Sequence, residues 1–355
     1  MRIIVDIGHP AHVHFFKNFI WEMEKRGHEI LITASKKEVT LDLLEAYNFD
    51  YIFTCKRYSG IEFGYELMKR DVQMFNLSRR FKPDVITGIH NTIAAHISRV
   101  TRAKSIIFTD SEHAKLANMV TFPFADVICT PSCFKKDLGK KQVRYNGYHE
   151  LAYLHPNYFK PDPSVLGELG LTESDKFIII RFVAWQATHD IGQHGFSMEA
   201  KRGLIKELEK YARVFITSES PLSGEFEQYR ITTPPEKIHD LLYYATLLIG
   251  DTQTMTTEAA VLGTPAIRCN SFVGPNDMGN FIELENKYDL IYSFREPDKA
   301  IPKALELLQQ PDSKKQWAKK RQRLLSDKID VTQFMVDFIE NYPQSFYRYK
   351  EGSKS

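Results

Sequence analysis

Short apolar runs alternate with amphipathic segments along the first half of the chain. Consecutive apolar residues predict buried strands, and apolar residues that recur every three or four positions predict helices. The predicted strands cover residues 2–7, 29–34, 84–88, 105–109 and 126–130. The predicted helices cover residues 12–25, 37–46, 62–80 and 91–101. This alternation is typical of a parallel sheet with helices on both faces.

The same alternation starts again after K-P-D-P at residues 160–163, which we interpret as a linker. The predicted strands here are 177–182, 212–217, 246–249 and 264–268, and the helices are 198–210, 236–244 and 254–262, with more helices after residue 297. Two such series predict an α/β protein with two Rossmann-like domains, residues 1–155 and 165–340. The last helix is a candidate to pack back on the first domain. Ligands bind beyond the carboxyl ends of parallel strands, so we expect the two edges to face each other across a cleft.

Length, charge and cysteine content narrow the class of protein. A chain of 355 residues usually needs two hydrophobic cores. The net charge of +2, with mixed signs along the sequence, does not indicate a nucleic-acid partner. The four cysteines include no C-x-x-C pair, and no apolar stretch approaches the length of a membrane span. We therefore expect a cytoplasmic protein. Peripheral contact with the inner face of the membrane and the oligomeric state stay open.

The most informative segment is G-D-T-Q-T-M-T-T-E-A-A-V-L-G-T-P at residues 250–265. It predicts a strand, a polar turn, a helix and a glycine stop. The first amide groups of the helix, near Thr254 to Thr256, have no partner within the helix and carry the positive end of its dipole, which suits a diphosphate. Glu258, one turn further on, could accept hydrogen bonds from both ribose hydroxyls. The alternative is that Asp251 or Thr252 only caps the helix.

This segment resembles the nucleotide-binding element of GT-B sugar-nucleotide enzymes. These include the lipid-linked GlcNAc transferase of peptidoglycan synthesis and the non-hydrolysing UDP-GlcNAc 2-epimerases. The likeness rests on E-A at 258–259, L-G-T-P at 262–265 and Arg268, whereas D-T-Q-T at 251–254 replaces the usual S-G-G. The resemblance implies the GT-B fold and a nucleotide sugar as substrate, with UDP as the expected nucleotide and no separate cofactor.

The N-terminal G-H-P-A-H-V-H at residues 8–14, followed by R-G-H-E-I at 26–30, resembles the first turn and helix of GT-B transferases. His12 aligns with the motif histidine, although Phe15 stands where proline is usual. A histidine at a helix start has a lowered pKa and suits a general base. Two alternatives stay open: a histidine that caps the turn, and a metal cluster of His9, His12 and His14.

Two loops after predicted strands carry titratable residues. T-D-S-E-H-A at 109–114 lies where epimerases have an acidic loop, but their E-A-G-L-R is absent. G-I-H-N-T at 88–92 lies in the place of their G-D-T-T turn. The loops supply acid–base candidates or are simply solvated loops with a helix cap. The catalytic candidates are His12, Asp110, Glu112 and His113, and the acceptor candidates are His9, His14 and His90.

In the second half, R-F-V-A-W-Q-A-T-H-D at 181–190 follows an apolar strand, and Ser218 follows the next one. Arg181 could bind a diphosphate with two parallel hydrogen bonds, or form an ordinary buried ion pair with an aspartate. His189 and Asp190 could bind sugar hydroxyls. The residues assigned to the nucleotide sugar are Arg181, His189, Asp190, Ser218, Asp251, Thr254, Met255, Thr256 and Glu258.

The basic run at 314–323 is interpreted as a solvated helix face, with contact to anionic lipid as the alternative. The strings S-E-H-A, R-F-V-A-W and T-M-T-T-E-A-A-V-L-G-T-P are most similar to the DUF354 family of predicted glycosyltransferases. The leading hypothesis is a metal-independent glycosyltransferase that moves a sugar from a nucleoside-diphosphate donor to a glycan or lipid-linked acceptor. The alternatives are a non-hydrolysing UDP-sugar 2-epimerase, which would need acid–base residues on both sides of the sugar, and a sugar-nucleotide-binding protein without catalysis.

Overall fold

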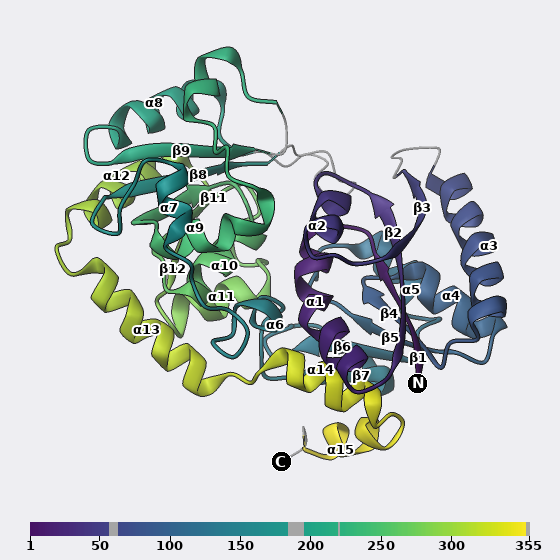
Figure 1. Cartoon of the computed structure of the whole chain (residues 1–355). Coiled ribbons are helices and arrows are strands. Elements are labelled where there is room, and N and C mark those ends of the chain that lie inside the picture. The colour runs from purple at the N-terminus through teal and green to yellow at the C-terminus, as the bar shows by residue number, and fades with distance from the viewer. Residues whose placement is uncertain (57–62, 184–194, 219–220, 353–355) are drawn as a thin grey trace. The chain divides into compact units, whose positions relative to one another are not determined.

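The structure, a computed structural model, describes residues 1–56, 63–183, 195–218 and 221–352. The chain divides into two compact units (Figure 1). Unit 1 contains Met1–Tyr158 and Lys328–Ser355, and unit 2 contains Phe159–Asp327. Each unit has one parallel sheet with helices on both faces, so the predicted Rossmann-like α/β architecture is confirmed.

Unit 1 is built on a seven-stranded sheet in the order β3-β2-β1-β4-β5-β6-β7. Its strands are β1 (Arg2–Ile7), β2 (Glu29–Lys36), β3 (Tyr51–Lys56), β4 (Val85–Ile89), β5 (Lys104–Phe108), β6 (Val127–Pro131) and β7 (Gln142–Tyr145). The strand order reverses between β1 and β4, where the chain leaves β1 in one direction and later returns on its other side. In a parallel sheet such a reversal opens a crevice at the carboxyl ends of the two strands.

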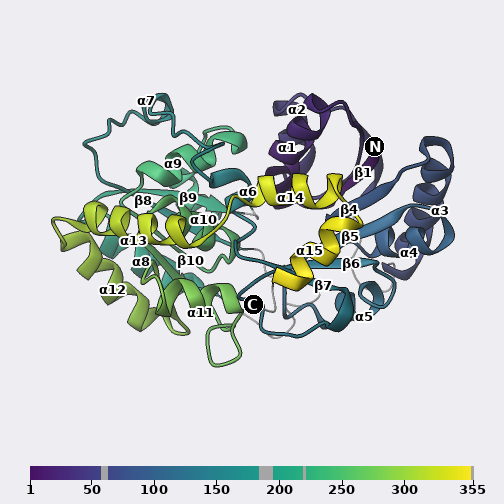
Figure 2. The same cartoon turned by 90° about the horizontal axis from the view of Figure 1, so that it is seen from below.

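Helices of unit 1 form two groups on opposite faces of this sheet. One group consists of α1 (Pro10–Lys25), α2 (Thr40–Ala46), α6 (Leu151–Leu154) and α14 (Val331–Glu340), and the other of α3 (Phe63–Phe81), α4 (Thr92–Val100) and α5 (Lys115–Thr121). Helix α15 (Gln344–Gly352) follows α14 and packs near β7. Both C-terminal helices thus belong to unit 1 (Figure 2). Unit 2 ends at Asp327, earlier than the predicted boundary at residue 340.

The return of the chain to unit 1 has a clear physical basis. The amide of Ile329 donates to the carbonyl of Asn146 over 2.9 Å. A Cβ on Gly147 would lie 2.4 Å from Cγ2 of Val331, so only glycine lets α14 approach the chain after β7 this closely. Phe334 and Phe338 of α14 are fully or almost fully buried. Burial of this apolar face stabilises the returning segment.

Unit 2 has a five-stranded sheet in the order β12-β11-β10-β8-β9. Its strands are β8 (Phe177–Phe182), β9 (Arg213–Ser218), β10 (Leu247–Gly250), β11 (Ala266–Cys269) and β12 (Ile291–Phe294). Its helices are α7 (Ser164–Glu168), α8 (Met198–Leu208), α9 (Ile238–Tyr244), α10 (Thr254–Leu262), α11 (Gly279–Asn286), α12 (Pro297–Gln309) and α13 (Ser313–Asp327). Here the order reverses between β8 and β10, which places the second crevice at Arg181 and Asp251.

The basic run predicted to form a solvated face lies on α13, and part of it bonds within unit 2. Lys314 donates to the carbonyl of Tyr244 at the end of α9 over 3.0 Å. Nε of Arg321 donates to the carbonyl of Val261 in the last turn of α10 over 2.8 Å. Cations at helix C-termini satisfy orphan carbonyls and oppose the helix dipole. In the part of the chain that the structure describes, no helix is long and apolar enough to cross a membrane.

Candidate active site

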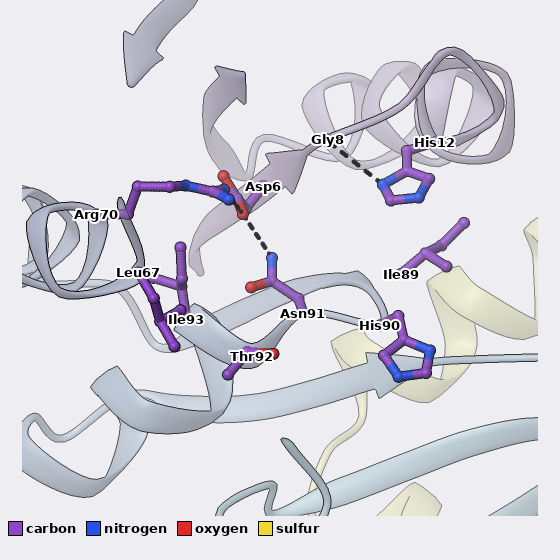
Figure 3. Close-up of a pocket in the computed structure, with 10 residues that line it drawn as sticks. All are labelled: Asp6, Gly8, His12, Leu67, Arg70, Ile89, His90, Asn91, Thr92 and Ile93. Carbon is purple, nitrogen blue, oxygen red and sulfur yellow. Dashed lines mark hydrogen bonds and ion pairs between the residues drawn. The ribbon is translucent and has the colours of Figure 1, made fainter. Parts of the chain in front are cut away.

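A small polar pocket of unit 1 lies at the crevice between β1 and β4 (Figure 3). Its cavity volume is about 60 Å³, which suits a few water molecules or one small polar group. Three segments supply its walls: the end of β1 with the start of α1, the end of β4 with the start of α4, and helix α3. The lining residues are Asp6, Gly8, His12, Leu67, Arg70, Ile89, His90, Asn91, Thr92 and Ile93.

Asp6 anchors this pocket as a buried carboxylate with 4% of its surface exposed. It accepts hydrogen bonds from Thr33 Oγ1 over 2.7 Å, from Asn91 Nδ2 over 2.8 Å and from Arg70 Nη2 over 3.1 Å. A carboxylate can be buried only when donors and a counter-charge replace its water, and these three groups do so. A Cβ on Gly88 would lie 2.5 Å from Asn91 Nδ2, so glycine is required for Asn91 to reach Asp6.

Of the predicted histidines at the start of α1, His12 lines the same pocket as Asp6, and His9 begins the helix. His9 is the N-cap of α1 and accepts from the Ala11 amide over 3.1 Å, and Pro10 occupies the first helical position. Nδ1 of His12 accepts from the Gly8 amide over 3.3 Å, as Figure 3 shows. A neutral His12 therefore carries its proton on Nε2. This tautomer suits a hydrogen-bond donor to a ligand oxygen, and a base role at Nε2 requires the ring to give up the Gly8 contact.

His14, the third histidine of the motif, does not line this pocket. It is buried, stacks on Tyr153 with ring centroids 5.4 Å apart, and its Nδ1 lies 3.3 Å from the hydroxyl of Tyr47. The pocket lining does not include it, so the structure gives no support to its predicted acceptor contact. The metal alternative is also unsupported, because the described residues contain no group of three or more histidine, cysteine, aspartate or glutamate side chains arranged to hold a metal ion.

His90 joins the pocket to the loop after β5. It has a φ of +49°, a left-handed conformation that is uncommon for a residue with a side chain. Its Nδ1 lies 3.1 Å from Oγ1 of Thr109, the residue that precedes Asp110. The structure thus brings His12 and His90 to one pocket and links His90 to the predicted acid–base loop.

Within that loop, the two acidic residues have different environments. Glu112 is 4% exposed, and its Oε1 accepts from the Lys135 amide over 2.6 Å. Its carboxylate thus ties the loop to the segment after β6. Asp110 is half-buried and accepts from the Ser111 hydroxyl over 3.1 Å. His113 is also half-buried.

The sequence interpretation missed His149, which pairs with Asp110. Nδ1 of His149 lies 3.5 Å from Oδ2 of Asp110, and the imidazole packs between the rings of Phe15 and Tyr145. Burial lowers the pKa of His149, and the charge of Asp110 opposes this shift only in part. The neutral imidazole is therefore favoured. The only signal in the sequence was the polar N-G-Y-H-E segment directly after β7.

In unit 2, the crevice between β8 and β10 brings together Arg181 and Asp251. Nη1 of Arg181 donates to Oγ1 of Thr217 over 2.9 Å. Oδ1 of Asp251 accepts from the Val183 amide over 2.8 Å. Arg268 and Asp277 form a buried arginine–aspartate pair in the same unit. Ser218 ends β9 beside Phe182. The predicted ligands His189 and Asp190 lie outside the described residues.

Helix α10 begins at Thr254, as predicted. Its N-cap residue is Gln253, which makes no capping hydrogen bond, and the first turn contains no acidic residue. Thr256 donates its hydroxyl to the carbonyl of Thr252 over 2.9 Å. The N-cap position thus belongs to Gln253 and not to Asp251 or Thr252. The amides of Thr256 and Thr257 donate to the carbonyl of Gln253 over 3.2 and 3.3 Å. The positive end of the α10 dipole can attract an anion.

Glu258 and Met255 lie on this helix, and both are buried. Oε1 of Glu258 is 3.0 Å from Nε2 of His239 on α9, a residue that the sequence interpretation missed. His239 is itself 3% exposed. The pair fixes the orientation of the Glu258 carboxylate one turn inside the helix start.

These features define a class of protein. Two Rossmann-like units, with a helix start at the strand reversal of the second, form the fold of GT-B enzymes. The chain belongs to the family described as "Protein of unknown function (DUF354)", whose model matches residues 1–344. It is also 26% identical to the uncharacterized protein MJ0665 of Methanocaldococcus jannaschii over 282 residues, 76% of this chain and 82% of that protein.

Solved structures with the same fold include both transferases and epimerases. S. aureus MnaA with UDP aligns with a TM-score of 0.68 at 9% identity and covers 97% of each chain. UDP-GlcNAc 2-epimerase from Neisseria meningitidis, bound to UDP-GlcNAc, aligns with a TM-score of 0.63 at 11% identity. The alignment covers 96% of this chain and 99% of that one. The glycosyltransferase SsfS6 of Streptomyces sp. SF2575 aligns with a TM-score of 0.60 at 12% identity. The alignment covers 94% of this chain and 99% of that one. These likenesses establish the fold.

Proposed function

We propose that the protein is a glycosyltransferase that uses a nucleoside-diphosphate sugar as donor. The observation that carries this proposal is the start of α10 at the strand reversal of unit 2, beside Arg181. The dipole of α10 and the guanidinium of Arg181, whose strand β8 pairs with β10 at this crevice, suit a diphosphate. UDP is the nucleotide we expect, since two structures with this fold contain UDP or UDP-GlcNAc.

The residues of unit 2 then take distinct roles. The first amides of α10 and the guanidinium of Arg181 bind the diphosphate and stabilise the negative charge that develops on it as it departs. Glu258 accepts hydrogen bonds from the ribose hydroxyls, and His239 positions its carboxylate. We propose that the reaction needs no metal, because helix dipole and guanidinium supply the positive charge.

The pocket of unit 1 suits the hydroxyl-bearing substrate. In the transfer step the acceptor oxygen forms a bond to the anomeric carbon, the bond from that carbon to the diphosphate oxygen breaks, and the acceptor proton passes to a base. His12 is the candidate base in its Nδ1-protonated tautomer, and the Asp110–His149 pair is the second candidate. Asp6 and His90 shape the pocket and offer contacts to hydroxyls.

A 2-epimerase is the second candidate, and two observations make it the weaker one. Epimerisation at C2 removes and returns a proton on carbon, so it needs titratable groups on both sides of the sugar. In the segment that lies in the place of the G-D-T-T turn, Asn91 is an amide that cannot titrate and that already binds Asp6 and caps α4. Glu112 is held by the Lys135 amide. The third candidate, a non-catalytic sugar-nucleotide-binding protein, predicts binding without turnover.

An experiment in heavy water separates these functions. The protein is incubated with UDP-sugars in D₂O, with and without lipid and glycan extracts as acceptors, and the products are followed by NMR and mass spectrometry. A transferase releases UDP only when an acceptor is present, and the remaining donor sugar contains no deuterium. An epimerase yields a second UDP-sugar with deuterium on C2, which would overturn the proposal. Binding of UDP without either product would support the non-catalytic alternative.

A further inference from the structure

A second hollow of unit 1, formed by α5 and the segments after β5 and β6, has a different character from the candidate active-site pocket. It is an open groove with a volume of about 610 Å³. Apolar side chains line its floor, among them Phe122, Ile128 and Leu138. Met119, at its edge, is 70% exposed, and Leu116 on the same helix is 57% exposed. An apolar groove with protruding apolar side chains beside it is an unusual surface for a protein in water.

Four lysines surround these apolar side chains: Lys115, Lys136, Lys140 and Lys141. Within the described residues none of them forms an ion pair with an acidic side chain. Nζ of Lys136 donates to the Glu112 carbonyl over 2.6 Å, and Nζ of Lys141 to the Pro123 carbonyl over 2.7 Å. Two acidic residues lie near the rim: Asp137 accepts from the Gly139 amide, and the charge of Asp126 acts on Lys141. The groove therefore combines an apolar floor with a positively charged rim.

A buried polar side chain in the groove also points to a ligand. Asn118 lines the groove and is only 7% exposed. Its Nδ2 and Oδ1 atoms have no hydrogen-bond partner among the residues that the structure describes. Leaving such groups unsatisfied is costly, so a ligand with polar atoms between its apolar and charged parts would gain from bonding to Asn118.

The groove shares a wall with the candidate active-site pocket of unit 1. Oγ1 of Thr121, in the last turn of α5, lies 2.7 Å from Oγ1 of Thr92, and the rings of Phe122 and His90 are 5.8 Å apart between centroids. Thr92 and His90 both line the pocket. A molecule that occupied the groove would thus lie directly beside the pocket.

We propose that this groove binds an anionic phospholipid at a membrane surface. An acyl chain occupies the apolar floor, the polar glycerol region bonds to Asn118, and the phosphate lies among Lys115, Lys140 and Lys141. Met119 and Leu116 enter the apolar edge of the bilayer. Apolar burial and lysine–phosphate attraction together provide the two signals that stable peripheral binding needs. The proposal concerns membrane binding alone and does not depend on the sugar chemistry.

Vesicle sedimentation tests the proposal with the full chain and without any nucleotide. Two kinds of vesicle are used, phosphatidylcholine alone and phosphatidylcholine mixed with phosphatidylglycerol. We expect binding only to the mixed vesicles and weakening at high salt. The double variant Lys140→Glu/Lys141→Glu and, separately, Met119→Asp should each lose at least about tenfold in binding, since each lysine near an anionic surface contributes roughly 1 kcal/mol.

Matched variants on unit 2 serve as controls. Met198→Asp and Lys206→Glu change an exposed methionine and a lysine of α8 and should bind vesicles as the wild type does. Thermal unfolding of every variant shows that it folds. Equal binding to both kinds of vesicle, or full binding by the folded groove variants, would overturn the proposal. So would self-association of the protein through Met119 in place of vesicle binding, or vesicle binding that excess inorganic phosphate abolishes at constant ionic strength.

Discussion

Asn91 donates a hydrogen bond from Nδ2 to Asp6 over 2.8 Å and so joins the start of α4 to the end of β1. The same side chain accepts from the Ala94 amide over 2.9 Å and caps α4. One amide group thus stabilises a helix and holds the buried carboxylate of the candidate active-site pocket. Nothing smaller or apolar at position 91 can do both.

Replacing Asn91 should therefore cost more than the loss of a helix cap. We expect Asn91→Ala to lower the free energy of unfolding of unit 1 by about 2–4 kcal/mol, the sum of a lost cap and a lost donor to a buried carboxylate. Ser197→Ala provides the control, because Ser197 caps α8 through the Ala200 amide and has no buried carboxylate to support. Ser197→Ala should lower the free energy of unfolding, measured with urea, by only about 0.5–2 kcal/mol. Equal costs would show that the bond to Asp6 contributes nothing.

Two glycines of unit 2 should respond to alanine in opposite directions. Gly263 ends α10 with a φ of +80°, and a Cβ there would lie 2.9 Å from Cδ of Arg321. We expect Gly263→Ala to destabilise unit 2 by about 1–2 kcal/mol, the cost of a left-handed residue with a side chain. Gly203 lies inside α8, where a Cβ would meet no heavy atom within 4 Å. Gly203→Ala should stabilise by roughly 0.5–1 kcal/mol. Thermal or urea unfolding measures both, and a destabilised Gly203→Ala would contradict the described environment of α8.

His149 should make unit 1 sensitive to mild acid. Burial holds its folded-state pKa below the unfolded value, so the folded state binds fewer protons. The contribution of the neutral, buried His149 to stability is fully present above about pH 6.5. It is lost as the pH falls through the lowered pKa of His149. When the pH is lowered from 7.5 to 5, we expect the melting temperature of His149→Asn to fall by less than that of the wild type. The variant itself should be less stable than the wild type at pH 7.5. An identical pH dependence in both proteins would contradict a neutral, buried His149.

Strands inside the two sheets were all predicted from the sequence, and of the four edge strands only β9 was predicted. Strand β8 and helix α10 were predicted with the observed bounds, because a run such as F-I-I-I-R-F and a glycine stop leave few alternatives. The three strands that were missed, β3, β7 and β12, are all at sheet edges. An edge strand is covered on fewer sides, so its sequence mixes polar and apolar residues and gives a weaker signal.

The candidate site was less predictable, since its key contacts join distant parts of the chain. Arg70 is 64 residues from Asp6 and lies on a helix that looked amphipathic and ordinary. The pairing of His239 with Glu258 depends on how α9 and α10 pack. Glu112 was assigned to catalysis by residue type, whereas its carboxylate holds a backbone amide. Residue type indicates what a side chain can do, but the topology decides what it meets.

Calorimetric titration of the protein with UDP tests the central proposal, a diphosphate site at the start of α10, most directly. Arg181→Met removes the guanidinium at the strand reversal, and Arg202→Met removes an arginine of α8 whose exposed ion pair with Glu225 lies outside the candidate site. We expect the wild type and Arg202→Met to bind UDP alike, and Arg181→Met to bind at least about tenfold more weakly, since hydrogen bonds to charged groups contribute roughly 1.5–3 kcal/mol. UDP binding that Arg181→Met leaves intact, or the absence of binding by any nucleoside diphosphate, would contradict the account.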